Sequence, residues 1–286
     1  MRQAERGVVL VTILSVMALC VTVIVAMTTR SEQAIRTTAQ AMDQTQAEML
    51  AISAETMAMA ALQHDLLVAG KADGPGEPWA QLGQSAAARS LGPVEISVWD
   101  DSARFNLNTL LNGNPTARHY LNAIVTIAGQ PPEVSVRIAA ALRGDRPLQQ
   151  ISDLVALAGL SDAEIAALSP LVTCAPILSG TININTASGT LLQAMLQNPE
   201  RTAQILARRQ AGLITPDVLS EMGVILPAGL SLRTDIFGLQ IIAASGSATV
   251  QSYARVQRWI GMDGATHTVI SARKWISASF VPDQPG

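Results

Sequence analysis

The feature that most constrains this chain is a run of about twenty residues near its start that contains no charged side chain. The run extends from Val8 to Met27, and its members are apolar or are Thr, Ser and Cys, whose polar groups can bond within a helix. At about 1.5 Å per residue, an α-helix of this length crosses a hydrocarbon core about 30 Å thick. We therefore predict a single transmembrane helix over residues 8–27.

The seven residues before this run predict its orientation. Arg2 and Arg6 outnumber the single acid, Glu5, and positive charges flanking a membrane helix favour the cytoplasmic side. The apolar run is longer than the core of a secretory signal, and no small-x-small cleavage site follows it. We expect an uncleaved apolar anchor, a cytoplasmic N-terminus and a chain outside the cytoplasm from Thr28 onward.

The helical pattern continues beyond the apolar run. Residues 28–69 contain no proline or glycine, and a seven-residue spacing places three apolar residues on one helix face: Ile35, Met42 and Met49. Four glycines or prolines between Gly70 and Pro78 then end any helix. We predict a stalk helix over 28–69 and a loop over 70–93, with Trp79 as its only large apolar anchor.

The rest of the chain predicts an α+β fold. Alternation in VEISVWDDSARFNLN predicts a β-hairpin over 94–107, and three strand-like runs within 231–276 predict an antiparallel meander. Residues 108–230 lack strand alternation and are rich in helical segments. We expect a helical domain inserted into a small sheet, followed by a tail over 277–286.

The inserted segment contains a repeat. The stretch FNLNT at 105–109 resembles ININT at 182–186, and DLVALAGL from Asp153 aligns without gaps on DVLSEMGV from Asp217. This alignment pairs Gly159 with Gly223. Two copies of one helical unit are predicted.

Polar residues at the starts of helices are interpreted mainly as caps. Asn108 and Asn185 are predicted to accept hydrogen bonds from the N–H groups of the helix that follows each of them. Asn198 precedes a proline and an acid, as a cap does, and Ser161 has capping-box spacing to Glu164. Catalysis or ligand binding by these residues is the alternative.

The leader ending in Arg6-Gly7, the stalk, the small sheet and the insert bearing NLNT and NINTAS together resemble the K-type minor pseudopilins of type II secretion systems. The resemblance covers essentially the whole chain after the leader, residues 1–7. It implies cleavage by prepilin peptidase after Gly7 and N-methylation of Val8. It also implies a bacterial inner-membrane protein whose bulk is periplasmic.

The resemblance further implies a function and partners. Such a protein caps the tip of the periplasmic pseudopilus and initiates its assembly, for export of folded exoproteins across the outer membrane. Its expected partners are the I-type and J-type minor pseudopilins, bound through the face carrying Ile35, Met42 and Met49. Contact of the tip with an exoprotein or with the outer-membrane secretin is left open.

Thr12 occupies the fifth position after the expected cleavage site, where most pilin-like proteins carry glutamate. That glutamate is thought to neutralise the buried N-terminal ammonium of a neighbouring subunit, since an unpaired charge is costly in an apolar bundle. A subunit with no neighbour ahead of it does not need the carboxylate, so Thr12 favours a tip position. The alternative is that Thr12 is merely a tolerated membrane residue.

A different function is suggested by the second repeat copy, which resembles the helix-hairpin-helix units of DNA-uptake and repair proteins. Such hairpins bind phosphate through N–H groups at a helix N-terminus and are normally glycine-rich, whereas the turn here is MLQNPER. The net charge of −3 gives no electrostatic reason to expect nucleic acid. The modest basic cluster Arg201, Arg208 and Arg209 is the remaining argument for a membrane-anchored DNA-binding protein.

No enzyme class is favoured. His64, His119 and His267 are isolated along the sequence, Cys174 has no base nearby, and no hydrolase, zinc or phosphate-loop motif is present. A hard cation needs about six oxygens, but the segment where some relatives bind calcium holds only Asp145 and Asp153. We expect no cofactor, and calcium is a possibility that the sequence does not support.

Overall fold

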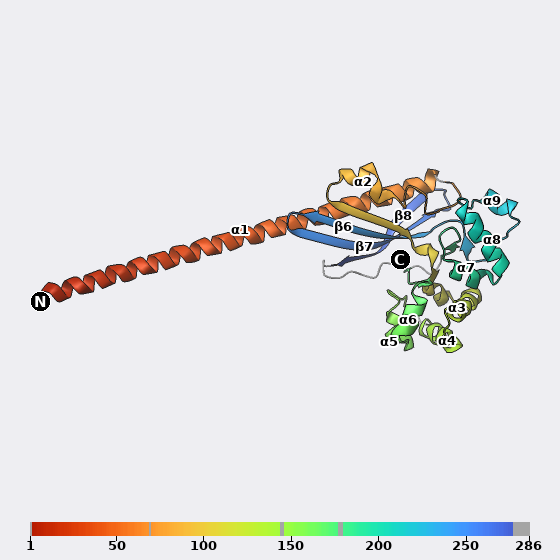
Figure 1. Cartoon of the computed structure of the whole chain (residues 1–286), viewed down its shortest axis with the longest axis horizontal. Helices are drawn as coiled ribbons and strands as arrows, with labels where there is room; N and C mark the ends of the chain where they lie inside the picture. The colour runs from red at the N-terminus through yellow and green to blue at the C-terminus, as the bar shows by residue number, and fades with distance from the viewer. Residues whose placement is uncertain (1, 69, 144–145, 177–179, 277–286) are drawn as a thin grey trace.

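The computed structural model describes residues 2–68, 70–143, 146–176 and 180–276. A single helix, α1 (Arg2–Val68), dominates its shape, and its first half extends alone away from the rest of the molecule (Figure 1). No proline interrupts these residues, and α1 ends just before Gly70, which has a φ of +87°. Left-handed φ values favour glycine and end helices.

The segment after α1 is more ordered than the predicted loop. It contains a 3-10 turn, η1 (Leu82–Gln84), and a short helix, α2 (Ala86–Ser90). Trp79 is buried as predicted and meets the ring of Phe237 edge-on, with 5.0 Å between ring centroids. Leu82 is buried as well, so Trp79 is not the only anchor of this segment.

Four antiparallel strands form the main sheet, and the predicted meander is confirmed. The strand order is β1-β6-β7-β8, with bounds β1 (Val94–Asp100), β6 (Ile236–Ser245), β7 (Ala248–Ile260) and β8 (Thr266–Ile276). The second half of α1 lies along one face of this sheet (Figure 1). Alanines on α1 allow this close approach, and together with a leucine they form its side of the core: Ala47, Ala51, Ala54, Ala58 and Leu62.

The predicted hairpin over 94–107 is wrong. β1 pairs with β6, whereas the two residues of β2 (Phe105–Asn106) pair in parallel with β3 (Val172–Thr173) outside the main sheet. The chain leaves the sheet through a 3-10 turn, η2 (Asp101–Ala103), which the Asp100 carboxylate caps by accepting the N–H of Ser102. The sheet therefore spans 94–100 and resumes at Ile236.

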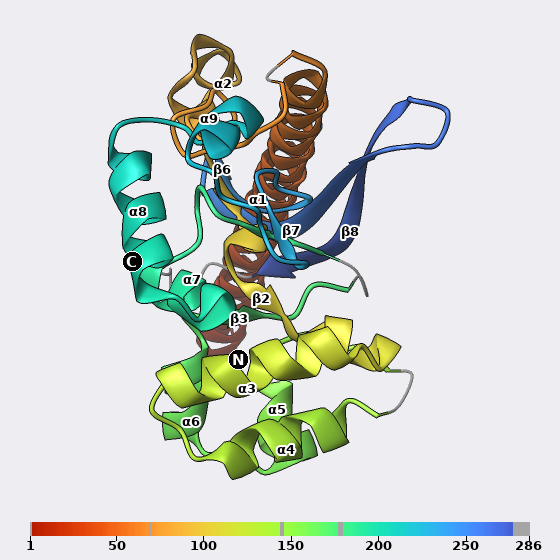
Figure 2. The same ribbon diagram turned by 90° about the vertical axis from the view of Figure 1, so that its right-hand side faces the viewer.

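The helical insert has its own hydrophobic core and lies at the end of the molecule far from the N-terminus (Figures 1 and 2). Its helices α4, α5 and α6 lie on the side away from α9 (Figure 2). The insert comprises η3 (Leu107–Asn112), α3 (Pro115–Ile127), α4 (Pro132–Ala141), α5 (Asp153–Ala158), α6 (Asp162–Leu168), α7 (Gly189–Leu196), α8 (Pro199–Gln210) and α9 (Pro216–Glu221).

The structure confirms the predicted repeat. The first unit (105–173) opens with β2 and closes with β3, and the second unit (182–231) opens with β4 (Ile182–Asn183) and closes with β5 (Leu230–Ser231). Each unit joins its two short strands in parallel. Gly159 and Gly223 both adopt a φ of +62° just after the equivalent helices α5 and α9. The two copies therefore share backbone geometry as well as sequence.

The capping role predicted for Asn108 and Asn185 is wrong. Asn106 caps η3 and Ser188 caps α7. Asn108 is instead buried and joins distant backbone: its Oδ1 accepts the N–H of Leu148, and its Nδ2 donates to the Leu148 carbonyl at 3.0 Å. In the second unit, Asn185 makes the same pair of bonds to Ile214. The predicted caps at Ser161 and Asn198 are confirmed.

Replacing Asn185 by alanine should lower the free energy of unfolding by about 2 kcal/mol, because it leaves two buried backbone groups of Ile214 without partners. Asn198→Ala is a matched control, since it removes an exposed cap and should cost about 1 kcal/mol. Urea denaturation of both variants measures the difference. Equal losses would show that the Asn185 bridge adds nothing beyond a cap.

Candidate assembly surface

The face of α1 opposite the sheet carries the apolar stripe predicted from the sequence. We call Ile35, Met42 and Met49 the stalk stripe; their side chains are 65–67% exposed. The seven-residue spacing continues toward the N-terminus through Val21 and Leu14, both exposed, with Thr28 in between. A sustained seven-residue repeat is typical of helices that pack along one another in a left-handed supercoil. We did not predict this continuation, although the sequence shows it.

The predicted processing and tip residues all lie at the start of α1. Gly7, Val8 and Thr12 are helical in backbone. α1 is long and apolar enough from Ile13 onward to cross a membrane, and no part of its apolar window is buried in the protein. A single-pass anchor fits this helix.

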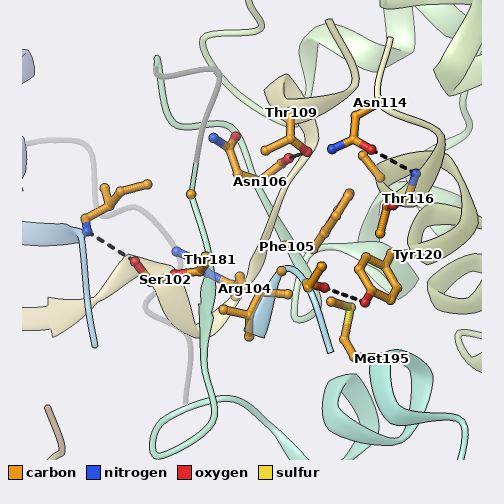
Figure 3. A pocket seen from close by; sticks show the side chains of 16 residues that line it. Ser102, Arg104, Phe105, Asn106, Thr109, Asn114, Thr116, Tyr120, Thr181 and Met195 are labelled. Carbon is orange, nitrogen blue, oxygen red and sulfur yellow. Dashed lines mark hydrogen bonds between the residues drawn. The ribbon is translucent and has the colours of Figure 1, made fainter. Parts of the chain in front are cut away.

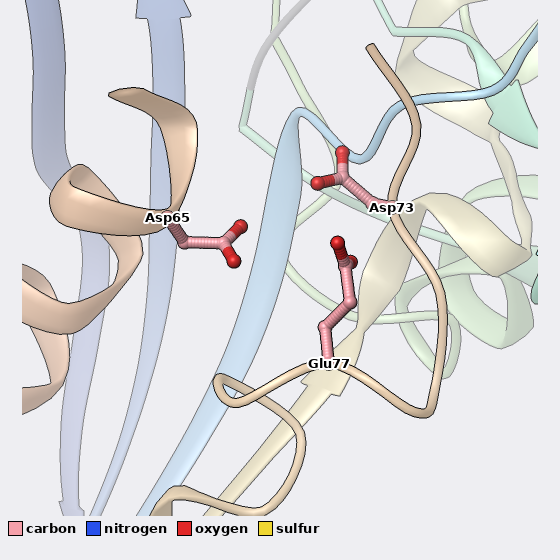
Figure 4. A group of neighbouring side chains, drawn as sticks. All are labelled: Asp65, Asp73 and Glu77. Carbon is pink, nitrogen blue, oxygen red and sulfur yellow. The ribbon is translucent and has the colours of Figure 1, made fainter. Parts of the chain in front are cut away.

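The top of the stalk is fixed to the sheet by a buried arginine. Three carboxylates, from Asp65 at the end of α1 and from Asp73 and Glu77 on the loop after it, point toward one another within 4.8 Å (Figure 4). Arg258 of β7 enters this group, donating to Asp65 at 2.7 Å and to Asp73. The Arg258 side chain is 1% exposed. A protein cation thus already sits among these acids.

The third carboxylate is held separately. Glu77 Oε2 accepts the backbone N–H of Gly74 at 2.8 Å and the indole N–H of Trp79 at 3.0 Å. Burial raises the pKa of Glu77 despite these two hydrogen bonds. The other acids considered for calcium offer no comparable group: Asp145 lies outside the described residues, and Asp153 accepts the N–H groups of Gln149 and Gln150.

Two consecutive aspartates at the end of β1 join the sheet to the insert. Asp101 binds the first unit and its surroundings: Oδ2 accepts from Thr173 at 3.1 Å and from Arg255 of β7 at 3.0 Å, and Oδ1 accepts from Arg104. Arg255 also donates to the Cys174 carbonyl at 2.5 Å. Asp101 is 1% exposed. The first unit is therefore tied to the sheet through a buried ion pair.

Asp100 makes the equivalent connection to the second unit. Its Oδ2 accepts from Thr234 at 2.6 Å, from Asn183 at 3.2 Å and from Thr186. Burial raises the pKa of Asp100 to about 6, against the lowering effect of these bonds and of the Ser102 N–H. The sequence analysis treated this Asp100-Asp101 pair only as a turn, because its partners lie far away in the chain.

Asp100 should make the stability of the protein depend on pH. Its folded pKa of about 6 exceeds the ordinary 3.8, so its contribution is full below pH 3.8 and is lost as the pH rises through 6. A difference of about two pKa values corresponds to about 3 kcal/mol. From pH 4 to 8, the free energy of unfolding of the wild type should therefore fall by up to that amount relative to Asp100→Asn. Urea denaturation across this range tests it, and a constant difference would contradict it.

A cavity of about 310 Å³ lies between the two repeat units (Figure 3). Arg104 and Phe105 line it from the first unit, and Ile182 and Met195 from the second. Several of its polar groups are already engaged within the protein, as when the Tyr120 hydroxyl donates to the Ala228 carbonyl at 2.5 Å. We interpret this cavity as part of the packing between the units.

The turn compared with DNA-binding hairpins joins α7 to α8. Asn198 Oδ1 occupies the N–H of Arg201, and Arg209 donates to the Ala187 carbonyl at 2.6 Å. Burial lowers the pKa of Arg209. At least one member of the predicted basic cluster therefore supports the fold of the second unit.

The remaining candidate residues lie apart. His64 is in α1, His119 of α3 lies 2.7 Å from the side-chain nitrogen of Gln197, and His267 of β8 stacks on Trp259. Cys174 is buried, and burial raises the pKa of its thiol to about 12, so the thiol stays protonated. Cys20 lies exposed in α1, and both cysteines are free.

Comparison with known proteins relates the whole chain to one group. Type II secretion system protein K of Klebsiella pneumoniae is 25% identical over 97% of this chain and 86% of its own length. The protein of the same name from Pseudomonas aeruginosa is 28% identical over 76% of each chain. No family model matches.

The fold agrees with these relatives. A chain in the crystal structure of the GspK-GspI-GspJ complex from enterotoxigenic Escherichia coli aligns with a TM-score of 0.58, covering 87% of this chain and 99% of that one at 20% identity. The two chains therefore share a fold, in which a long apolar helix, an antiparallel sheet and a helical domain occur together. With relatives of one name along nearly its whole length, this chain belongs to the K-type minor pseudopilins of type II secretion systems.

Proposed function

We propose that this minor pseudopilin caps the tip of the periplasmic pseudopilus and initiates its assembly for export of folded proteins across the outer membrane. The observation that carries the proposal is the position of the insert, which lies at the end of the molecule far from the membrane helix (Figure 1). A subunit stacked above this one would meet the insert. One copy at the end of a filament avoids that clash.

Processing and location follow from the start of α1. Prepilin peptidase cleaves after Gly7 in this proposal, and Val8 becomes the methylated N-terminus. The apolar segment spans the bacterial inner membrane once, with Arg2 and Arg6 on the cytoplasmic side and the sheet and insert in the periplasm. Thr12 leaves no carboxylate at the position where an interior subunit would need one.

The I-type and J-type minor pseudopilins are the proposed partners. The structural neighbour is described as a complex of GspK with GspI and GspJ. The stalk stripe supports helical partners, because its seven-residue spacing matches a supercoiled helix pair and it runs on into the membrane segment. A partner packed along it would itself be membrane-anchored. Contact with exoproteins or with the secretin belongs to the free side of the insert.

Changing Met42 to lysine should reduce the yield of the complex with the I-type and J-type subunits at least tenfold. A lysine in the centre of a helix interface buries a charge without a partner, and a tenfold loss corresponds to only about 1.4 kcal/mol. Co-purification from detergent-solubilised membranes measures the yield, and the full-length chain should stay folded because Met42 is exposed.

Met262→Lys is the matched control, since Met262 is fully exposed at the β7–β8 turn and lies off the stripe. It should leave the yield unchanged. Equal yields for Met42→Lys and wild type would remove the stalk stripe from the assembly surface.

A further inference from the structure

The sheet has a second face, opposite α1, which we call the outer face. Two cross-strand rows define it: Ser97, Gln240, Tyr253 and Lys274 form one, and Glu95, Ile242, Gln251 and Ile276 form the next. Their neighbours along the strands, such as Ile241 and Ala254, point into the core against α1. Among the described residues, α1 is the only helix that packs broadly on β6, β7 and β8.

Two amides on this outer face are nevertheless buried. Gln240 is 6% exposed and Gln251 is 8% exposed. A glutamine on an uncovered sheet face ordinarily keeps its amide in water, because burying it without hydrogen bonds is costly. Something other than the described helices must therefore cover the middle of the outer face.

The neighbouring tryptophan gives an independent indication. Trp99 of β1 lies flat over Gly238, where any Cβ would come within 1.9 Å of the indole. Its indole N–H is buried, yet finds no acceptor among the described residues. A buried indole N–H usually has a partner. This donor therefore indicates that the missing cover supplies a carbonyl or another acceptor.

We propose that the C-terminal tail, residues 277–286, folds back across the outer face and forms this cover. β8 ends at Ile276, which is itself in the row of Gln251. Four extended residues reach about 13 Å, whereas two strand spacings are about 10 Å, so Phe280 can lie over Tyr253 or Gln240. The tail carries Phe280 and Val281 for the apolar part of the face.

The chemistry of the tail fits in two further ways. Asp283 is its single charged side chain, opposite in sign to Lys274 on the outer face. Its backbone carbonyls can accept from Trp99 and from the glutamine amides. With the outer face closed by the tail, the stalk stripe is left as the main apolar surface of the stalk and sheet for partner subunits. The proposal does not depend on the tip position.

Paired cysteines test this arrangement in the full-length chain in detergent, with Cys20 changed to serine. Gln240→Cys combined with Phe280→Cys should form an intramolecular disulfide under a mild oxidant, seen as loss of two free thiols without dimer formation. Met262→Cys combined with Phe280→Cys is the matched control and should keep both thiols, because the β7–β8 turn lies beyond the proposed path.

Labelling distinguishes a misplaced pair from a wrong proposal. Tyr253→Cys should react with a maleimide at least tenfold faster when the chain ends at Ile276 than when residues 277–286 are present. Ile35→Cys, on the stalk stripe, should react equally in both chains and controls for folding. An equal rate at position 253 with and without the tail, together with no disulfide, would overturn the proposal.

Discussion

Replacing Arg258 by methionine should lower the free energy of unfolding by about 3 to 5 kcal/mol, because it leaves two buried carboxylates without their cation. Asp65 and Asp73 are each 6% exposed at their side chains and both pair with this arginine. The guanidinium also donates to the carbonyls of Leu62 and Thr234. Urea denaturation of the chain from residue 28 onward measures the loss.

Arg273→Met is a matched control on the neighbouring strand. Arg273 pairs with Glu55 of α1, but its side chain is 39% exposed, so its loss should cost about 1 kcal/mol. Adding Asp65→Asn and Asp73→Asn to Arg258→Met should recover part of the stability, because the uncompensated charges are then gone. If Arg258→Met costs no more than Arg273→Met, Arg258 does not hold the stalk to the sheet.

The elements predicted correctly are those specified by local patterns. An uninterrupted run without proline from Val8 to Val68 specifies one helix, and glycines separate strands that pair with their nearest neighbours. The repeat was visible because both units reuse the same residues. In each case, the information lies within a few tens of residues.

The errors have a common physical cause. The hairpin over 94–107 was predicted because apolar residues recur beyond the turn, yet Asp100 and Asp101 bind Thr234 and Arg255, which are 134 and 154 residues away. Asn108 was interpreted as a cap, whereas its partner Leu148 lies 40 residues on. A residue type that suits a local role can equally serve a distant one, and a single sequence does not distinguish them.

One missed feature did leave a signal. Inward-facing positions of β7 include Val250, Ala254 and Val256, and the next inward position is Arg258. An arginine in register with core residues requires buried acids, since Arg is seldom fully buried unless paired. Asp65 and Asp73 were candidates, but which acids it meets depends on the packing of α1 against the sheet.

Removing the insert should change where the protein sits in the pseudopilus. Asp100 and Phe237 are paired residues of β1 and β6, so their Cα atoms lie about 5 Å apart and a two-residue Asn-Gly turn can replace residues 101–236. The shortened chain keeps the stalk stripe and most of the sheet. It should therefore still bind the I-type and J-type subunits.

The number of copies per filament is the informative measurement. If the bulk of the insert confines the wild-type protein to the tip, the shortened chain should occur at several copies per sheared filament, counted by quantitative immunoblotting against the major subunit. Met42→Lys in the shortened chain should abolish this incorporation, which shows that entry still uses the stalk stripe. Many copies of the unmodified protein along each filament would show that the tip assignment is wrong.

Thr12 separates the two causes that could restrict the protein to the tip. If the missing carboxylate also matters, Thr12→Glu in the shortened chain should raise the copy number further, because each added subunit can then neutralise the ammonium of its neighbour. The same change in the full-length chain should have no effect, since the insert still blocks stacking. A full-length Thr12→Glu protein found along the filament would instead make the carboxylate, and not the bulk of the insert, the determinant of position.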